Sequence, residues 1–173
     1  VKDTGGYWQV TTDSIGEGFH YYSLLIDGVA IADPASETFY GMGRMASGIE
    51  IPFTGGGYYA IKDVPHGDVS IKKYYSSTTN SWRRMYVYTP PGYNSNTSEK
   101  YPVLYLLHGG GEDERGWATQ GKTDLIIDNL LSENKAKPML VVMMDGNFGS
   151  GRIAGFGERS LQAFENELKQ SVI

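Results

Sequence analysis

A histidine followed by three glycines, His108-Gly109-Gly110-Gly111, comes directly after the apolar run 102–107. Because glycine has no side chain, the backbone N–H groups of such a loop can approach a ligand closely. N–H groups placed in this way can stabilise the oxyanion that develops during acyl transfer. The loop is therefore predicted to bind an oxyanion, and the alternative is a tight glycine turn that leads into a helix.

Residues 1–173 lack the usual sequence contexts of a catalytic nucleophile. No Gly-x-Ser-x-Gly sequence, in which a nucleophilic serine is often found, occurs in them. The three histidines are His20, His66 and His108, so no histidine follows the glycine loop. The chain has no cysteine, which excludes disulfides, thiol catalysis and cysteine-bound metals. We interpret His20 and His66 as structural residues.

Acidic residues occur at two places near the loop. Glu112, Asp113 and Glu114 form a run directly after it. Such a run could hold a metal ion, but a solvated acidic loop is the commoner arrangement, and we predict no metal. Asp145-Gly146 closes a second apolar run. Because Asp145 precedes any later nucleophile, we interpret it as a turn or pocket-lining residue.

Residues 67–173 are predicted to form the first half of an α/β fold with a mostly parallel sheet. Four strands are expected, at 69–75, 84–89, 102–107 and 139–144. The last two are nearly continuous apolar runs, which are typical of strands covered on both faces. Two helices are expected, one capped by Thr123 and one beginning at Ser160. Their apolar stripes are Ile126, Ile127, Leu130 and Leu131 in the first and Leu161, Phe164, Leu168 and Val172 in the second.

Residues 1–66 are predicted to be all-β. Two apolar runs flank Asp27-Gly28, a strong signal for a hairpin with a type I′ turn. Two further short strands are expected at 49–52 and 58–61, and short strands at this spacing favour a small β-sandwich. Proline and glycine beside His66 mark a change of pattern, so we place the boundary between domains 1–66 and 67–173 there.

The composition limits the classes of function. Lysine and arginine number 15 and aspartate and glutamate 20, and the resulting net charge of −5 argues against nucleic-acid binding. No apolar run reaches the ~18 residues that a membrane-spanning helix needs, so no membrane partner is predicted. No signal peptide is recognisable at the first residues. The chain ends at Ile173 inside the last predicted helix, so we expect it to continue in a longer protein.

Consecutive motifs along the chain resemble one group of hydrolases. In the second half these are residues 86–93 (YVYTPPGY), 101–111 (YPVLYLLHGGG), 116–117 (GW) and 137–146 (KPMLVVMMDG). They resemble the esterase D-like α/β-hydrolases, and within these carbohydrate esterase family 1, the feruloyl and acetyl-xylan esterases. In the first half, residues 18–22 (GFHYY), 26–28 (IDG) and 33–34 (DP) resemble the Ig-like early-set domain related to glycogen-binding modules, which precedes several such esterases.

The resemblance implies a serine carboxylic-ester hydrolase that uses neither metal nor cofactor. In this group one oxyanion N–H comes from the residue after the first loop glycine, here Gly110, with Gly111 as the second choice. The serine, acid and histidine of the triad would lie beyond Ile173, in the remaining C-terminal half of the esterase domain. The nucleophile strand of that half would pair with the strand at 102–107.

The resemblance also suggests residues that line the pocket. Trp117 is expected on its acyl or sugar side, with a lid-packing aromatic as the alternative. Asp145 and Gly146 are expected to contact substrate as well. His108 is interpreted as an orienting or structural residue rather than a base, because the base of a triad is expected elsewhere.

The implied substrates are feruloyl or acetyl esters of plant cell-wall xylan, or the corresponding oligosaccharides, and they imply a secreted or periplasmic protein. Two alternatives remain: a non-catalytic carbohydrate-binding protein, and a thioester hydrolase of the same superfamily. Aromatic side chains of the first half could stack on sugar rings, although a core or domain contact is the commoner role. They are Trp8, Tyr21, Tyr22, Phe39, Tyr40, Tyr58 and Tyr59.

Overall fold

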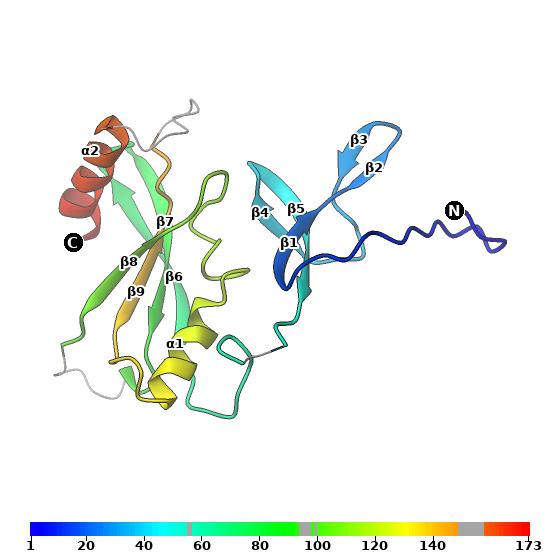
Figure 1. Cartoon of the computed structure of the whole chain (residues 1–173). Helices are drawn as coiled ribbons and strands as arrows, with labels where there is room; N and C mark the ends of the chain where they lie inside the picture. Colours follow the sequence, from blue (N-terminus) through cyan, green and yellow to red (C-terminus); the bar gives the residue numbers. More distant parts are fainter. Residues whose placement is uncertain (55–56, 94–97, 99, 149–157) are drawn as a thin grey trace.

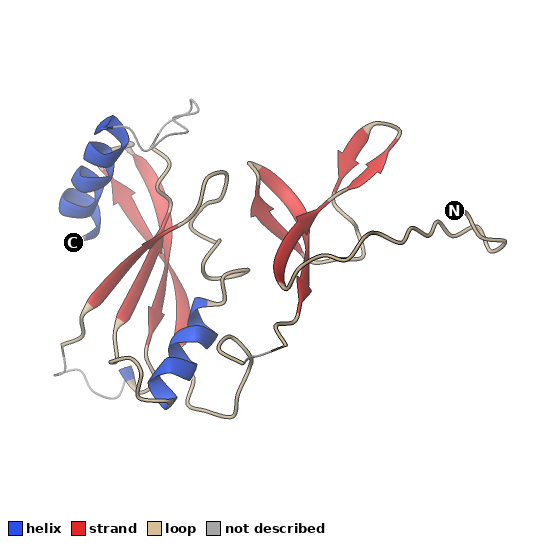
Figure 2. Cartoon of the chain, in the orientation of Figure 1, coloured by secondary structure: helices blue, strands red, loops and turns tan. Residues whose placement is uncertain are grey.

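Two β-sheets of different size and a separate two-stranded hairpin form the framework of the described structure (Figure 1). The structure is a computed structural model that describes residues 1–54, 57–93, 98, 100–148 and 158–173. The smaller sheet belongs to the N-terminal part, and the larger sheet with both helices to the C-terminal part (Figure 2). An exposed and largely irregular arm, residues 1–17, precedes the smaller sheet.

The smaller sheet has three antiparallel strands in the order β1-β5-β4, and the hairpin β2-β3 is separate from it. The strands are β1 Gly18–Tyr22, β2 Leu24–Ile26, β3 Val29–Ile31, β4 Thr38–Gly41 and β5 Arg44–Ile51. Asp27 and Gly28 connect β2 to β3 with φ angles of 50° and 82°, which confirms the predicted hairpin. Every residue of β2 and β3 is exposed, so the hairpin does not cover the sheet as a second layer. The Ig-like assignment stays a prediction.

The prediction of a strand at residues 58–61 is wrong. Residues 57–67 form no strand, and the first of them lie against helix α1 (Thr123–Ser132). The buried side-chain amide of Asn129 on α1 donates to the carbonyl oxygens of Gly57, Tyr58 and Ala60, at 3.3, 3.0 and 2.9 Å. A helix side chain therefore satisfies the backbone groups that a neighbouring strand would have paired.

The larger sheet has the strand order β6-β7-β9-β8. Its strands are β6 Asp68–Ser76, β7 Ser81–Thr89, β8 Val103–Leu107 and β9 Leu140–Met144. Only β8 and β9 are parallel, whereas β7 is antiparallel to both β6 and β9. The prediction of a mostly parallel sheet is therefore wrong for the described strands, because the hairpin β6-β7 joins the sheet beside β9. The four predicted strands of this part are confirmed, with no end more than three residues from its predicted position.

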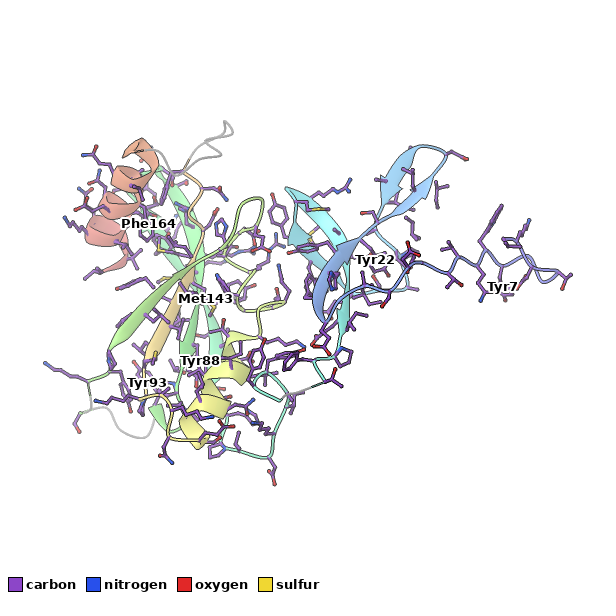
Figure 3. The ribbon with its side chains drawn as sticks, viewed as in Figure 1. Tyr7, Tyr22, Tyr88, Tyr93, Met143 and Phe164 are labelled. Atoms are coloured by element: carbon purple, nitrogen blue, oxygen red, sulfur yellow. The ribbon has the colours of Figure 1, made fainter. Side chains whose placement is uncertain are left out.

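Burial differs sharply between β8 and β9. The central strand β9 contributes Val141 and Met143 to a core with Tyr88 and Ile127, and Tyr88 and Met143 are labelled in Figure 3. At the sheet edge, Val103 of β8 is 42% exposed, because among the described residues β8 has a neighbouring strand on one side only. The expectation that 102–107 is covered on both faces is therefore wrong for this structure.

The two helices lie on opposite faces of the larger sheet. Asp128 of α1 accepts a hydrogen bond from Tyr88, whereas Glu167 of α2 (Glu158–Glu167) pairs with Arg83. Tyr88 and Arg83 are five residues apart on β7, and side chains separated by an odd number along a strand point to opposite faces. A π-helical turn, Leu168–Val172, continues α2. None of the described helices is long and apolar enough to cross a membrane.

The predicted capping of α1 by Thr123 is wrong. Lys122 occupies the N-cap position with a φ of 48°, and Thr123 is the first helical residue. The Thr123 hydroxyl donates to the carbonyl oxygen of Trp117 at 2.8 Å. The threonine thus ties the helix start to the preceding loop instead of accepting a helical N–H. The predicted apolar stripe of α1 does face the core, through Ile127 and Leu131.

Asp128 connects α1 to the segment that precedes β6. Its carboxylate is 1% exposed and accepts hydrogen bonds from the Tyr88 hydroxyl at 2.6 Å and the Gly67 N–H at 3.0 Å. The ring of His66 pairs with the same carboxylate at 2.9 Å. This hydrogen bond to Asp128 raises the pKa of His66 above its ordinary value near 6.5.

Stability should therefore depend on the charge of His66. A pKa raised by folding contributes stability that is fully present below about pH 6.5 and is lost as the pH rises through the folded pKa. Urea unfolding at about pH 6 and about pH 8.5 should show a smaller loss of stability at the higher pH in His66→Asn than in the wild type. His20→Asn is the matched control and should keep the wild-type difference. An unchanged pH difference in His66→Asn would contradict this coupling.

Candidate functional site

The glycine loop and Asp145 meet at one edge of the larger sheet. β8 and β9 run in parallel, with Leu107 opposite Met144 in the register. The residues after each strand, His108 and Asp145, therefore come together at the carboxyl ends of both strands. Ligands bind at this edge in open α/β sheets.

His108 links the two strand ends. Its Nε2 lies 3.1 Å from Oδ1 of Asp145 and 3.0 Å from the N of Gly146, and its Nδ1 lies 2.8 Å from the carbonyl oxygen of Gly109. The side chain is only 7% exposed. Because both ring nitrogens are occupied by the structure around them, the geometry fits the orienting role predicted for His108.

The pair of His108 and Asp145 favours its charged form. Burial lowers the pKa of His108, but the hydrogen bonds to Asp145 and to the Gly109 carbonyl outweigh it and raise that pKa above its ordinary value. Burial raises the pKa of Asp145, yet the hydrogen bonds from His108 and the Asn147 N–H, together with the charge of Arg83, lower it overall. The contacts of His108 with Asp145, Gly146 and Gly109 hold the base of the glycine loop in place.

Gly110 and Gly111 are exposed and present free donors. Their N–H groups make no hydrogen bond with the residues that the structure describes. A Cβ on Gly110 would meet open space, whereas one on Gly111 would lie 3.2 Å from Cα of Met42. Gly111 also has a φ of +79°, which favours glycine. Free N–H groups in an exposed loop are what an oxyanion-binding loop requires, and the assignment of the donors stays a prediction.

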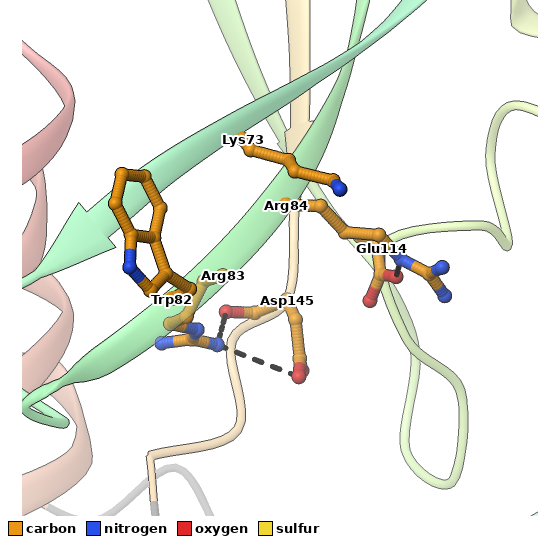
Figure 4. Close-up of a pocket in the computed structure, with 6 residues that line it drawn as sticks. All are labelled: Lys73, Trp82, Arg83, Arg84, Glu114 and Asp145. Carbon is orange, nitrogen blue, oxygen red and sulfur yellow. Dashed lines mark hydrogen bonds and ion pairs between the residues drawn. The ribbon is translucent and has the colours of Figure 1, made fainter.

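A cavity of about 650 Å³ opens beside Asp145 (Figure 4). Its walls are Lys73, Trp82, Arg83, Arg84, Glu114 and Asp145. The view shows cationic side chains beside two carboxylates, each of which pairs with an arginine. Asp145 thus lines this cavity, and its contact with substrate stays a prediction. Trp117 and Gly146 are not among the lining residues of this cavity.

Arg83 is a site residue that the sequence analysis missed. Its guanidinium is 9% exposed, lies 3.4 Å from the Asp145 carboxylate, and donates to the backbone carbonyls of Asp145 and Asn147 at 2.5 and 3.0 Å. On its other side it pairs with the fully buried Glu167 at 3.5 Å. The sequence did contain a signal for it, the neighbouring pair Arg83-Arg84. Side chains alternate between the two faces of a strand, so one arginine of such a pair must point to each face.

Trp117 lies across the end of β8. Its indole N–H donates to the carbonyl oxygen of Leu107 at 2.6 Å, and 38% of the residue is exposed. A Cβ on Gly121 would lie 2.7 Å from the ring, so the loop packs closely on it. The structure shows a tryptophan that braces the strand end, and its contact with substrate stays a prediction.

The acidic run is not a solvated loop. Asp113 and Glu114 are 9% and 6% exposed, and they pair with Arg115 and Arg84 respectively. Glu112 accepts hydrogen bonds from Tyr21 and from the Gly109 N–H. The prediction of a solvated loop is therefore wrong, because arginine and tyrosine partners hold the carboxylates. In the described ranges no group of three His, Asp or Glu residues could hold a metal ion.

The N-terminal aromatic residues fall into distinct groups. Tyr21 and Tyr40 contact the loop after β8, so they join the N-terminal part to the larger sheet's side of the chain. Tyr22 donates to Asp33 within its own part of the chain. Trp8 and Tyr58 are 79% and 56% exposed. Phe39 lines a hollow of about 410 Å³ between the two parts, and the lining residues are Phe19, Glu37, Phe39, Gly48, Glu50, Thr119, Gln120 and Lys122.

The sheet order, the helices on both faces and a glycine loop at the carboxyl ends of parallel strands define part of an α/β-hydrolase. The esterase family, described as "Putative esterase", matches residues 76–169. The chain therefore belongs to this family of esterases.

Three similar proteins support the assignment of the chain to this esterase family. The chain is 40% identical over 177 residues to an endo-1,4-beta-xylanase/feruloyl esterase of Xylanibacter ruminicola, covering 99% of this chain and 24% of that protein. It is 31% identical over 110 residues to endo-1,4-beta-xylanase Y of Acetivibrio thermocellus, covering 63% of this chain and 9% of that protein. A CE1 ferulic acid esterase from Anaeromyces mucronatus, solved with ferulic acid, matches with a TM-score of 0.52 and 30% identity, covering 65% of this chain and 42% of that one. The chain thus spans less than half the length of each of these proteins.

Proposed function

We propose that this chain is part of a serine carboxylic-ester hydrolase that removes feruloyl or acetyl groups from plant cell-wall xylan. The observation that carries the proposal is the exposed loop 109–111, whose free N–H groups stand at the carboxyl end of β8. The 40% identity to a xylanase/feruloyl esterase over nearly the whole chain supports the substrate class.

In this proposal the chain supplies charge stabilisation and the rest of the protein supplies the triad. A serine outside residues 1–173 attacks the ester carbonyl, and the carbonyl oxygen becomes an oxyanion. The N–H of Gly110, with Gly111 as the second choice, donates to that oxygen and so lowers the barrier. His108 holds the loop through Asp145 and Gly109 and takes no proton from the nucleophile. No metal or cofactor takes part.

The proposed partners follow from the substrate. They are feruloylated or acetylated xylan or its oligosaccharides, and the C-terminal half of the esterase domain. That half would contribute a strand against the exposed edge of β8. We place the division between an N-terminal accessory domain and the esterase domain near His66, and a protein with these substrates would act outside the cytoplasm, secreted or periplasmic.

The full-length protein should release ferulate from methyl ferulate and from feruloylated arabinoxylan, or acetate from acetylated xylan. It should also be labelled by a fluorophosphonate, because the proposed nucleophile is an activated serine. Chromatography of the released acid and mass spectrometry of the labelled peptide measure the two results. A thioester substrate serves as the comparison, and a strong preference for it would favour the thioester hydrolase. If the protein neither released the acid nor became labelled, the proposal would be contradicted.

A further inference from the structure

The glycine loop cannot hold its own conformation. Residues 109–111 have no side chains to pack, and glycine loses more backbone freedom on ordering than any other residue. Within the loop, the Glu112 N–H donates to the Gly109 carbonyl at 3.2 Å, and the Gly109 N–H donates to Oε2 of Glu112 at 3.3 Å. The carboxylate of Glu112 therefore closes the turn that carries Gly110 and Gly111, and whatever holds this carboxylate also holds the loop.

The N-terminal sheet holds Glu112 through Tyr21. The Tyr21 hydroxyl donates to Oε1 of Glu112 at 2.8 Å, and the side-chain amide of Gln120 donates to the same hydroxyl at 2.6 Å. Burial and the neighbouring Glu112 raise the pKa of Tyr21, so the phenol remains protonated as a donor. A Cβ on Gly41 would lie 2.2 Å from Cζ of Tyr21, so this glycine lets the ring cross β4 toward the loop.

The turn between β4 and β5 makes a second contact with the loop. Met42 and Gly43 have φ angles of 55° and 74°, which direct the Gly43 N–H to the carbonyl oxygen of Gly111 at 2.8 Å. The two backbones are close enough that a Cβ on Gly111 would lie 3.2 Å from Cα of Met42. The peptide unit after Gly111 is thereby tied to the smaller sheet.

Further contacts define how the smaller sheet lies on the esterase part. The Arg115 guanidinium lies 4.8 Å from the ring centroid of Tyr40. The ammonium group of Lys122 lies 4.9 Å from the ring centroid of Tyr59 and pairs with Glu50 of β5. Together with the Tyr21 contact, these contacts hold the N-terminal part against the segment between β8 and α1 at several points.

We propose that the N-terminal sheet is a positioning element of the ester-hydrolysing site, in which Tyr21 and the β4–β5 turn hold the loop 109–112 in its oxyanion-binding conformation. The proposal rests on the proposed function and adds a task for the first half of the chain. Oxyanion donors work because they are oriented before the reaction begins. Loosening the loop should therefore lower kcat on every ester, including esters without a sugar chain.

The test compares two hydroxyl deletions on the same strand in the full-length protein. Tyr21→Phe removes the donor to Glu112, and Tyr22→Phe removes a hydroxyl that donates to Asp33 at 2.8 Å. With methyl ferulate and p-nitrophenyl acetate, Tyr21→Phe should lower kcat about tenfold and leave KM within about twofold. Tyr22→Phe should keep the wild-type kcat. A loss confined to polymeric xylan would overturn the proposal, because a sugar-binding surface would then explain it.

A double-mutant cycle tests whether Tyr21 acts through Glu112. Adding Tyr21→Phe to Glu112→Ala should change kcat by less than about twofold, since residues in one network are not additive. An equal tenfold loss in both backgrounds would show that Tyr21 does not act through this carboxylate, and would overturn the proposal.

Hydrogen exchange separates a failure of this proposal from a failure of the proposed function. In Tyr21→Phe, peptides covering Gly109 and Glu112 should exchange faster than in the wild type and in Tyr22→Phe. If the wild type hydrolyses no ester, the proposed function fails, and the catalytic role of the sheet fails with it even where exchange shows that the loop is held. If the wild type is active, unchanged exchange or unchanged kcat in Tyr21→Phe refutes the positioning role alone.

Discussion

Purified residues 1–173 should hydrolyse methyl ferulate and p-nitrophenyl acetate no faster than buffer. The sequence contains a loop with free N–H groups but no Gly-x-Ser-x-Gly nucleophile and no histidine after His108. Removing the nucleophile or the base of a serine hydrolase costs on the order of 10⁶-fold in kcat, and what oxyanion donors and binding retain is small. The full-length protein, assayed in parallel at the same concentration, should hydrolyse these esters at least about 10⁴-fold faster than the isolated segment.

The folding of the isolated segment must be checked alongside its activity. Circular dichroism should show β-structure, and size-exclusion chromatography should reveal oligomers if the exposed edge of β8 pairs with other copies, as unpaired strand edges tend to do. Hydrolysis above buffer that a fluorophosphonate abolishes would show a nucleophilic serine within residues 1–173. That result would contradict the expected division of the site.

Gly110→Pro in the full-length protein should lower kcat by about 10²-fold or more. Proline has no N–H, so the substitution removes the donor that we assign to the oxyanion. The Gly110 N–H has no partner in the described structure, and a side chain there meets open space. The loss should therefore come from the missing donor rather than from a broken internal hydrogen bond or a clash. Steady-state kinetics with methyl ferulate measures the effect.

The matched comparison is Gly110→Ala, which adds a methyl group at the same place and keeps the N–H. It should lose far less activity than Gly110→Pro, and the ratio between the two variants isolates the donor. Circular dichroism and the unfolding midpoint should confirm that both variants fold. A folded Gly110→Pro enzyme with wild-type kcat would refute the assignment and would direct attention to Gly111.

Features encoded by neighbouring residues could be predicted from the sequence alone. The Asp27-Gly28 hairpin follows from a turn that needs positive φ at both positions, and both residues show it. The strand before His108 and the strand before Asp145 follow from continuous apolar runs, and their parallel pairing brings the two residues together. The exposed glycine loop was predictable for the same reason, because a glycine run after such a strand needs no distant partner to be recognised, whereas its oxyanion-binding role stays a prediction.

Features that depend on distant partners required the tertiary structure. Nothing in the run 112–114 indicates that Glu112 pairs with Tyr21, 91 residues earlier, or that Glu114 pairs with Arg84. The same carboxylates would be solvated without those partners, and this is why the solvated-loop prediction was wrong. The burial of Arg83 likewise requires two distant partners. Asp145, which follows β9, and Glu167 of α2 must both lie beside the Arg83 side chain of β7.

The sequence by itself determined most of the strands and helices and the position of the glycine loop after its strand, since backbone preferences and apolar periodicity act over a few residues. Only the tertiary structure decided that the strand at 102–107 lies exposed at an edge, that residues 57–67 lie against α1 instead of forming a strand, and that the smaller sheet supports the glycine loop. The physical reason is that a side chain becomes buried or hydrogen-bonded only where two parts of the folded chain come into contact. A charge or a hydroxyl in the chain does not specify which surface it will meet.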